Sequence, residues 1–246
     1  MRNIYKKKIA ELISYSNFVA KSNKSVLTYH SINDKKNDLT SDIYQISPIK
    51  FQEHIDGLIN KSIQFKNLKN LFDDKPGILI TFDDGYKSIC KLGIDYLIKN
   101  KISALLFVCP KFIELDHNDY INKDDLKKLL DSGFVEIGSH SFDHVRLTEC
   151  NDEKLEYQLN QSKFWLEKNL SIKIESISYP FGDTDERVEN YALKAGYKYG
   201  FTTKFNSLEK TKNNLRIPRL DIWSHDDFNI VYSKIKGQWN WMSFFT

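Results

Sequence analysis

The sequence predicts an α/β protein in which parallel strands alternate with helices. Short apolar runs and longer amphipathic stretches follow one another along most of the 246 residues. Some runs, such as residues 78–82, are almost continuously apolar, which is typical of strands covered on both faces. The alternation indicates βαβ units, closed into a barrel or open as a sheet. Because no repeat or Pro/Gly-rich linker interrupts it, we expect one folded domain.

In the first half of the chain, caps and apolar spacing define the elements. Ser47-Pro48 combines an N-cap with a proline suited to the first helical position. Asn122 caps a later helix, which Gly133 ends. The expected order is strand 26–30, helix from Ser47, strand 78–82, helix 86–99, strand 102–108 and helix 122–133.

The second half repeats this alternation. Asp183 and Glu186 have the spacing of a capping box, and Gly196 ends the helix that they begin. The polar segment 204–214 is expected to be a surface loop. The expected order is strand 134–137, helix 152–170, strand 174–179, helix 183–193, strands 197–202 and 215–222, and helix 226–235.

Composition excludes several classes of protein. With 41% hydrophobic and 28% charged residues, the chain is typical of a folded domain and not of a disordered one. The 36 Lys+Arg against 33 Asp+Glu give a net charge of only +3, which argues against a nucleic-acid partner. Cys90, Cys109 and Cys150 are far apart without a CxxC pair, so the sequence indicates neither a disulfide framework nor a cysteine zinc site.

Each end of the chain carries an apolar segment with two possible contacts. Residues 1–24 are predicted to form an amphipathic helical segment. Its apolar stretch is broken by polar residues, so it does not match a signal peptide, and we expect a cytoplasmic protein. The tail 239–245 is rich in aromatic residues. Each end either packs on the body or touches the inner face of the membrane, and no run reaches the roughly 18 apolar residues of a membrane span.

The first segment whose residues could carry out chemistry is Thr81–Gly85, TFDDG, directly after the strand 78–82. Catalytic groups of α/β folds lie at the carboxyl ends of strands. Two adjacent carboxylates repel each other unless something such as a divalent cation offsets the repulsion. Asp-Asp-Gly is also common in turns, so by itself this segment permits either interpretation.

The second segment, Glu136–His144, also follows a strand and places His140 and His144 four residues apart. On one helical turn such a pair shares a face and can bind one ion. Zinc accepts two imidazoles and a carboxylate while keeping a position open for water. The third segment, Ser178–Asp183, follows another strand, and its Pro and Gly indicate a tight turn whose backbone N–H groups could face the same site.

Together, the three segments resemble the polysaccharide deacetylase family, the carbohydrate esterases that share the NodB homology domain. Thr81–Gly85 matches the first motif, TFDDG, and His140–His144 matches the second, H-[ST]-x-x-H. Tyr179, Pro180, Phe181 and Gly182 match most of the third. The resemblance covers roughly residues 26–222. It implies that residues 25–246 form a NodB-like domain, a distorted (β/α) barrel of about seven parallel strands.

The resemblance also implies roles. Asp83 corresponds to the general base, and Asp84, His140 and His144 to the ligands of one divalent metal ion. Zinc is favoured, with cobalt, nickel and manganese as alternatives, because this ligand set tolerates each of them. Residues 26–32 resemble the leading L-x-Y-H segment of the branch that deacetylates poly-N-acetylglucosamine, which assigns the general acid to His30.

The chain departs from the family pattern at two places. The third motif lacks its leading arginine, near Ser178, so Arg219 and Asp221 are candidates for orienting Asp83. The late L-x-[LI]-x-H motif is absent, and His225 is therefore the alternative general acid.

These residues predict a metal-dependent hydrolase that removes N-acetyl groups from an amino-sugar glycan or its precursor, in surface-polysaccharide synthesis. The metal and a backbone N–H near Phe181 would stabilise the oxyanion. Aromatic residues in the motifs suit the apolar faces of sugar rings. Two alternatives remain: an amidohydrolase acting on small non-sugar amides, and a non-catalytic glycan-binding module. Oligomeric state is not predicted.

Overall fold

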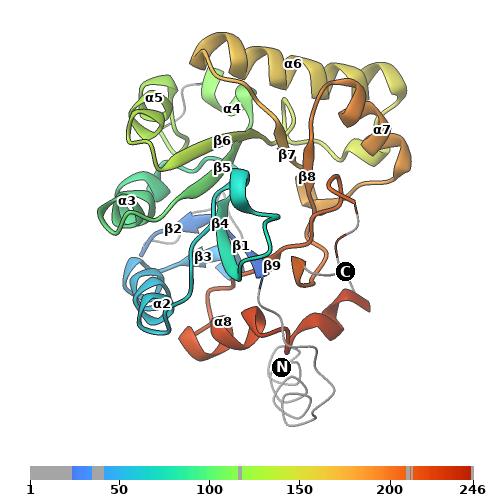
Figure 1. Cartoon of the computed structure of the whole chain (residues 1–246). Coiled ribbons are helices and arrows are strands. Elements are labelled where there is room, and N and C mark those ends of the chain that lie inside the picture. Colours follow the sequence, from blue (N-terminus) through green and yellow to red (C-terminus); the bar gives the residue numbers. More distant parts are fainter. Residues whose placement is uncertain (1–23, 35–41, 116–117, 209–210, 212, 245–246) are drawn as a thin grey trace.

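A curled sheet of parallel strands forms the centre of the computed structural model, which describes residues 24–34, 42–115, 118–208, 211 and 213–244. The sheet has seven strands in the order β8-β7-β6-β5-β4-β1-β9, and every neighbouring pair in it is parallel (Figure 1). The strands are β1 (Lys24–Tyr29), β4 (Gly77–Phe82), β5 (Ala104–Val108), β6 (Val135–Ser139), β7 (Ser176–Ser178), β8 (Tyr199–Phe201) and β9 (Leu220–Asp221). A small second sheet pairs β2 (Ser31–Ile32) with β3 (Gln45–Ile46).

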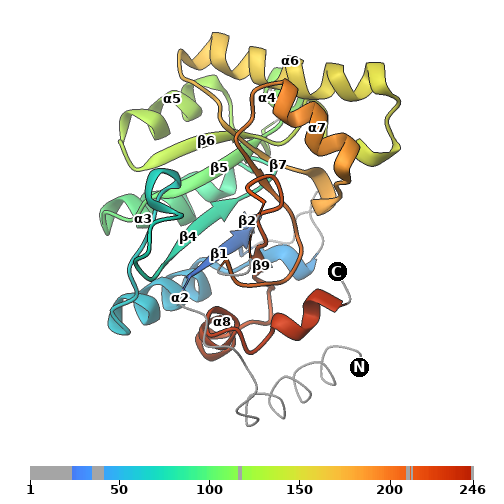
Figure 2. The ribbon, with the colours of Figure 1, turned by 45° about the vertical axis from the view of Figure 1, so that its right-hand side comes forward.

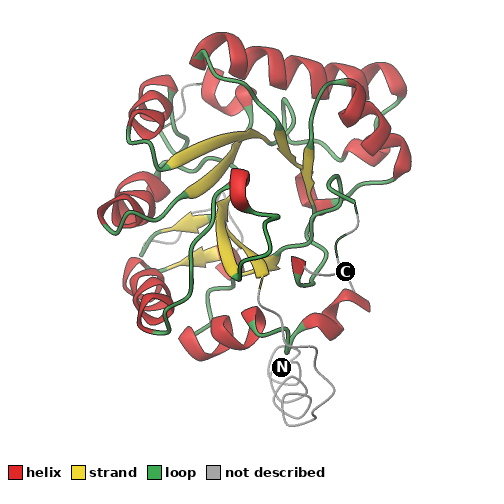
Figure 3. Ribbon diagram, in the orientation of Figure 1, coloured by secondary structure: helices red, strands yellow, loops and turns green. Residues whose placement is uncertain are grey.

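Helices surround the strands, as Figure 3 shows. They are α2 (Pro48–Asn60), α3 (Asp95–Lys99), α4 (Pro110–Glu114), α5 (Lys123–Asp131), α6 (Asp152–Leu170), α7 (Glu186–Lys194) and α8 (Phe228–Ile235). The predicted caps of α2 and α5 are confirmed: the Ser47 side chain accepts from the Lys50 N–H at 3.3 Å, and that of Asn122 from the Asp125 N–H at 2.9 Å.

One segment connects the two edges of the sheet and closes the barrel. Ile217 forms a parallel bridge with Phe201 at the end of β8, and three residues later Leu220 pairs with Leu27 of β1. The predicted strand 215–222 is wrong in extent, since only Leu220–Asp221 is a strand. Pro218 interrupts it, because proline has no N–H to donate to a ladder.

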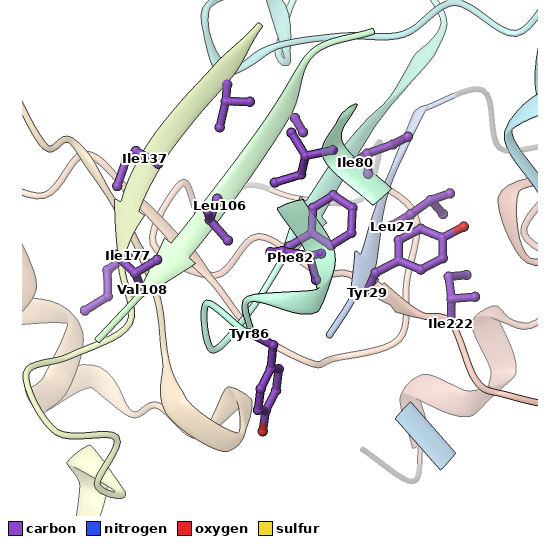
Figure 4. Close-up of a cluster of buried hydrophobic side chains, with 14 of the residues drawn as sticks. Leu27, Tyr29, Ile80, Phe82, Tyr86, Leu106, Val108, Ile137, Ile177 and Ile222 are labelled. Carbon is purple, nitrogen blue, oxygen red and sulfur yellow. The ribbon is translucent and has the colours of Figure 1, made fainter. Parts of the chain in front are cut away.

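The strands alternate side chains between two apolar layers. Leu27, Ile80 and Leu106 belong to the large cluster between sheet and helices, part of which is shown in Figure 4. Their neighbours in the chain, Val26, Leu79, Leu105 and Phe107, belong to a smaller cluster. Its other members are Leu71, Phe201, Leu208 and Ile217. The smaller cluster fills the inside of the curled sheet, as the period of two requires.

Parallel pairing brings the carboxyl ends of β1, β4, β5 and β6 to one edge. Tyr29 is in register with Phe82, and Val108 with Ser139; Figure 2 shows β1 and β4 running side by side. The residues that follow these strands, His30, Asp83 and His140, therefore emerge at the same edge. The fold thus brings His30 together with the first two sequence segments.

Several sequence predictions are corrected. The expected helix 86–99 begins at Ser88 and contains a π-helical turn, Cys90–Ile94, before α3. The predicted Asp183/Glu186 capping box is wrong, because the Asp185 side chain accepts from the Val188 N–H at 2.8 Å. Helix α4 was not expected from the sequence.

The structure describes most of the C-terminal tail but almost none of the predicted N-terminal segment. Predicted segment 1–24 lies outside the described residues except for Lys24, which begins β1. In the tail, Trp239 and Met242 are each only 4% exposed, so this part packs on the body. Among the described residues, no helix combines the length and apolarity needed to cross a membrane.

Candidate functional site

A cavity of about 420 Å³ opens where the strand ends meet. Its lining combines acidic, imidazole and aromatic side chains from all three sequence segments and from four further places in the chain. The lining residues are His30, Tyr44, Asp83, Asp84, Tyr86, His140, His144, Arg146, Phe181, Gly182, Thr203 and Asp221.

Asp84, His140 and His144 form one wall, which we call the imidazole side. The Asp84 Oδ1 atom lies 3.2 Å from His140 Nε2 and 3.3 Å from His144 Nε2. One ligand atom from each residue can be chosen so that all three lie within 4.8 Å of one another. Asp84 Oδ1 is buried and has no hydrogen-bond partner within the described part of the chain. A carboxylate oxygen facing two imidazole nitrogens without a hydrogen bond fits a divalent cation bound among them.

A backbone contact orients the first imidazole. His140 Nδ1 lies 2.7 Å from the carbonyl oxygen of Ser178, on the neighbouring strand β7. An Nδ1–H that donates to this carbonyl leaves the Nε2 lone pair directed at Asp84 and at a metal, an arrangement common around histidine ligands. Burial opposes ionisation of Asp84, but the two imidazoles beside it lower its pKa well below the usual range.

The imidazole side is built on unusual backbone. Its backbone enters the left-handed region, which non-glycine residues rarely adopt, at Asp84 (φ 68°), Ser141 (61°) and His144 (60°). The neighbouring Phe181 does the same, with φ 61°. His140 and His144 therefore do not share a helical turn, as the spacing suggested; they converge across an irregular turn. The Ser141 Oγ atom accepts from the His144 N–H at 3.1 Å and holds this turn closed.

Asp83 lines another part of the cavity, with Ser178 and Arg219 buried behind it, and we call these three residues the arginine side. Arg219 is fully buried and donates from Nη1 to Asp83 Oδ1 at 2.8 Å and from Nη2 to Oδ2 at 2.7 Å. Ser178 Oγ also donates to Asp83 Oδ2, at 3.0 Å. Burial alone would raise the pKa of Asp83, but the Arg219 charge and, to a lesser degree, His140 lower it to about 2. Asp83 is consequently a carboxylate held in one orientation.

Of the two residues expected to orient Asp83, only Arg219 contacts it. Asp221 lies elsewhere on the wall, in the cavity with His30. Burial raises the pKa of Asp221, while the nearby His30 acts in the opposite direction. His30 Nδ1 and Asp221 Oδ1 are both buried without a hydrogen-bond partner among the described residues. The Tyr44 ring packs on the His30 ring with centroids 4.5 Å apart.

His225, the alternative general acid, does not line the cavity. Its ring stacks on Trp223 at 5.7 Å, and its Nε2 lies 3.8 Å from Asp226 Oδ1. The geometry therefore favours His30 over His225 for chemistry in this cavity.

The third sequence segment contributes only part of what was predicted. Phe181 and Gly182 line the cavity, whereas Tyr179 and Pro180 are buried and are not among its lining residues. The Gly182 N–H donates to the Tyr179 carbonyl at 2.8 Å, which leaves the Phe181 N–H as the candidate oxyanion donor of this turn. Phe181 is half exposed, and its ring lies 4.8 Å from that of His144.

Sequence reasoning missed Tyr44, Arg146 and Thr203. Arg146 stands two residues after His144 and packs its guanidinium 4.3 Å from the centre of the Phe181 ring, so proximity to a motif was the available signal. Tyr44 ends a short 3-10 helix and Thr203 lies in a loop. Neither segment carries a motif, and only the fold brings these residues to the cavity.

Comparison with known proteins identifies relatives of this chain. A sequence profile of the family described as polysaccharide deacetylase matches residues 72–200. The poly-beta-1,6-N-acetyl-D-glucosamine N-deacetylase of Staphylococcus aureus (strain MRSA252) is 30% identical over 212 residues, which cover 79% of this chain and 73% of the relative.

Solved structures share the fold. The deacetylase PplD of Streptococcus pyogenes superposes with a TM-score of 0.78 at 18% identity, over 88% of this chain and 99% of that one. IcaB from Ammonifex degensii gives a TM-score of 0.77 at 19% identity, over 87% and 97% of the two chains. These likenesses confirm the predicted barrel of parallel strands.

Proposed function

The chain belongs to the polysaccharide deacetylase family, and from this premise we propose that it is a metal-dependent hydrolase that removes N-acetyl groups from an amino-sugar polymer or its precursor. The observation that carries the proposal is the cavity in which Asp84 Oδ1 faces two imidazole Nε2 atoms at 3.2 and 3.3 Å beside a second, separately held carboxylate. Amide hydrolysis needs an activated water, a polarised carbonyl and a proton for the leaving nitrogen.

Asp84, His140 and His144 are the residues that would hold the metal. A divalent cation held by these residues, with zinc favoured, would supply a Lewis acid for an acetyl carbonyl and would lower the pKa of a bound water to about 7. The chain's contribution is to keep the ligands in place. The Ser178 carbonyl directs His140, and the turn closed by Ser141 directs His144.

Asp83 is the proposed general base. Because Arg219 and His140 lower its pKa to about 2, the side chain is ionised at any pH near neutrality. The bidentate contact with Arg219 fixes the carboxylate and prevents it from turning towards the metal ligands. The third motif of this chain lacks its leading arginine, and we assign the orientation of Asp83 to Arg219 instead.

His30 is the proposed general acid, which protonates the departing amine. It lines the same cavity as Asp83 and Asp221. Contact with the Tyr44 ring restricts how the His30 ring can turn. The Phe181 N–H would donate to the oxyanion, a contribution worth about 3 kcal/mol for one donor.

The substrate is proposed to be a glycan bearing N-acetylglucosamine. Tyr44, Tyr86 and Phe181 line the cavity and offer rings for the apolar faces of sugars. The name of the staphylococcal relative makes a β-1,6-linked N-acetylglucosamine oligomer the first compound to test. A cytoplasmic location, with a precursor as the substrate, stays a prediction from the sequence, as does membrane contact through either terminus.

Metal analysis combined with an acetate-release assay tests the proposal. The purified chain should contain bound divalent metal and release acetate from β-1,6-linked oligomers, or from nucleotide- or lipid-linked N-acetyl sugars. A chelator should abolish release, and zinc or cobalt should restore it. Ammonia release from ureides without acetate release would favour the small-amide alternative. Binding of glycans by a metal-loaded chain with no hydrolysis would favour a non-catalytic module.

A further inference from the structure

Gln158, in the middle of α6, contacts the turn between the two imidazoles. Its side chain is 1% exposed. Its Oε1 atom accepts two hydrogen bonds, from the Phe142 N–H at 3.1 Å and from the Asp143 N–H at 3.2 Å. These two N–H groups lie between His140 and His144, so one side-chain oxygen from a helix binds the backbone that separates the proposed metal ligands.

The turn needs such an acceptor because its backbone is irregular. With Ser141 and His144 both in the left-handed region, residues 141–144 form no strand ladder and no helix. The His144 N–H is bound by Ser141 Oγ, within the turn itself. Gln158 supplies a link to a rigid 19-residue helix, α6.

We propose that Gln158 is a positioning residue for the metal centre: it holds the turn so that the imidazoles of His140 and His144 both face Asp84. This inference rests on the proposed function, since it assumes that these three residues bind a metal. Partners that orient metal ligands from outside typically change metal affinity by about 10–100-fold when they are removed. Gln158 does not line the cavity and is no ligand itself.

Cobalt(II) titration of the metal-free full chain, followed by visible absorption, tests the proposal. Gln158→Met has a similar shape but no acceptor for the two N–H groups, and it should bind cobalt about 10–100-fold more weakly than the wild type. Gln158→Glu keeps an acceptor oxygen and should retain most of the affinity. Competition with a chromophoric chelator should give the same order for zinc.

Ser162→Ala is the matched control. Ser162 lies four residues further along α6, is also fully buried, and its Oγ contacts Ser139 Oγ on β6 at 2.6 Å. It should lower the thermal stability of the metal-free chain without changing cobalt affinity. A purely structural role of Gln158 would give Gln158→Met that same pattern and overturn the proposal.

The outcomes separate this inference from the proposed function. If the wild type binds cobalt and Gln158→Met binds it equally well, only the role of Gln158 is wrong. If the wild type binds neither cobalt nor zinc, the metal centre is wrong and the inference falls with it. Should Gln158→Met not fold, Gln158→Asn, which withdraws the acceptor by one methylene, is measured in its place, and undiminished affinity would again refute the proposal.

Discussion

Two adjacent aspartates, Asp83 and Asp84, have opposite surroundings although they share a sequence context. Both oxygens of Asp83 are bound by the buried Arg219, and Ser178 adds a further bond. Asp84 Oδ1 faces two imidazoles and has no hydrogen-bond partner among the described residues. The first arrangement keeps a carboxylate ionised and fixed, and the second leaves an oxygen available to a cation. Neighbouring groups, not residue type, separate the two roles.

The backbone differs between the two sides as well. The imidazole side contains left-handed φ angles at Asp84, Ser141 and His144, whereas Asp83 and Ser178 on the arginine side do not depart from ordinary φ. Left-handed conformations at non-glycine residues cost of order 1–3 kcal/mol each and gather at functional sites. The imidazole side is therefore assembled by strained turns, and the arginine side by side-chain hydrogen bonds among residues at or next to strand ends.

The largest expected effect comes from making the same substitution at both aspartates. Asp83→Asn should lower turnover by about 10²–10⁴-fold, the range of a lost general base, and leave metal content unchanged. Asp84→Asn should lose both metal and turnover, because an amide oxygen is a weaker ligand than a carboxylate. Metal content and acetate release of the two variants provide the measurement. If both variants lose metal, or both keep it, the contrast between the aspartates is wrong.

The proposed ligands could be found from the sequence because each lies within a few residues of a strand end. The motif spacing identified Asp84, His140 and His144, and parallel topology then required them to share an edge. The sequence could not give the conformation of the turn between the histidines. Ser141 is not a residue type that signals a left-handed backbone, and the enrichment of histidine in that region is too weak to predict one, so helical spacing was the natural and wrong interpretation.

Residues that act across long distances in the chain were harder to predict. Arg219 and Asp221 were equal candidates to orient Asp83, and only the path of 217–221 from β8 to β1 distinguishes them. Gln158 had a signal that was available but unused: it is a polar residue on the buried face of α6, beside Leu155 and Leu159. A buried amide on an apolar helix face indicates a backbone group that needs a partner.

The next effect should come from Arg219, whose removal leaves Asp83 buried without its partner. Arg219→Met should destabilise the chain by about 3–5 kcal/mol, and adding Asp83→Asn should recover much of the loss, because the uncompensated charge is then gone. Urea unfolding of the two single variants and the double variant measures the coupling.

Arg187→Met is the matched control for this double-mutant cycle. Arg187 pairs with the largely exposed Asp152 at 2.9 Å, and exposed ion pairs are worth about 0–1 kcal/mol. Additive effects of Arg219→Met and Asp83→Asn would show that the arginine side is not the coupled unit described here.

A smaller effect should appear in the pH dependence of stability. The pKa of Asp83 is about 2 in the folded chain against an ordinary 3.8. A lowered folded pKa means that the unfolded chain binds the proton more readily as the pH falls. The stabilisation, about 2 kcal/mol, is therefore complete above about pH 5 and declines as the pH approaches 2.

Urea unfolding of the wild type and Asp83→Asn, both with chelator, measures this decline. The stability difference between them should shrink by about 2 kcal/mol from about pH 5 to about pH 2, while the titration of Asp84 is common to both chains. A difference that does not vary with pH would contradict the lowered pKa.

The smallest expected effect tests backbone strain at Phe181, which lies beside the imidazole side and has a φ of 61°. Glycine adopts this conformation without the steric cost, so Phe181→Gly should stabilise the fold by up to about 1 kcal/mol. It also removes a ring from the cavity and should raise KM for N-acetylglucosamine oligomers more than it lowers kcat. Ser171→Gly, at the exposed end of α6 with φ 54°, should give a similar gain in stability with unchanged KM. If Phe181→Gly gave neither a gain in stability nor a rise in KM, the left-handed conformation of Phe181 would be neither a source of strain nor an aid to substrate binding.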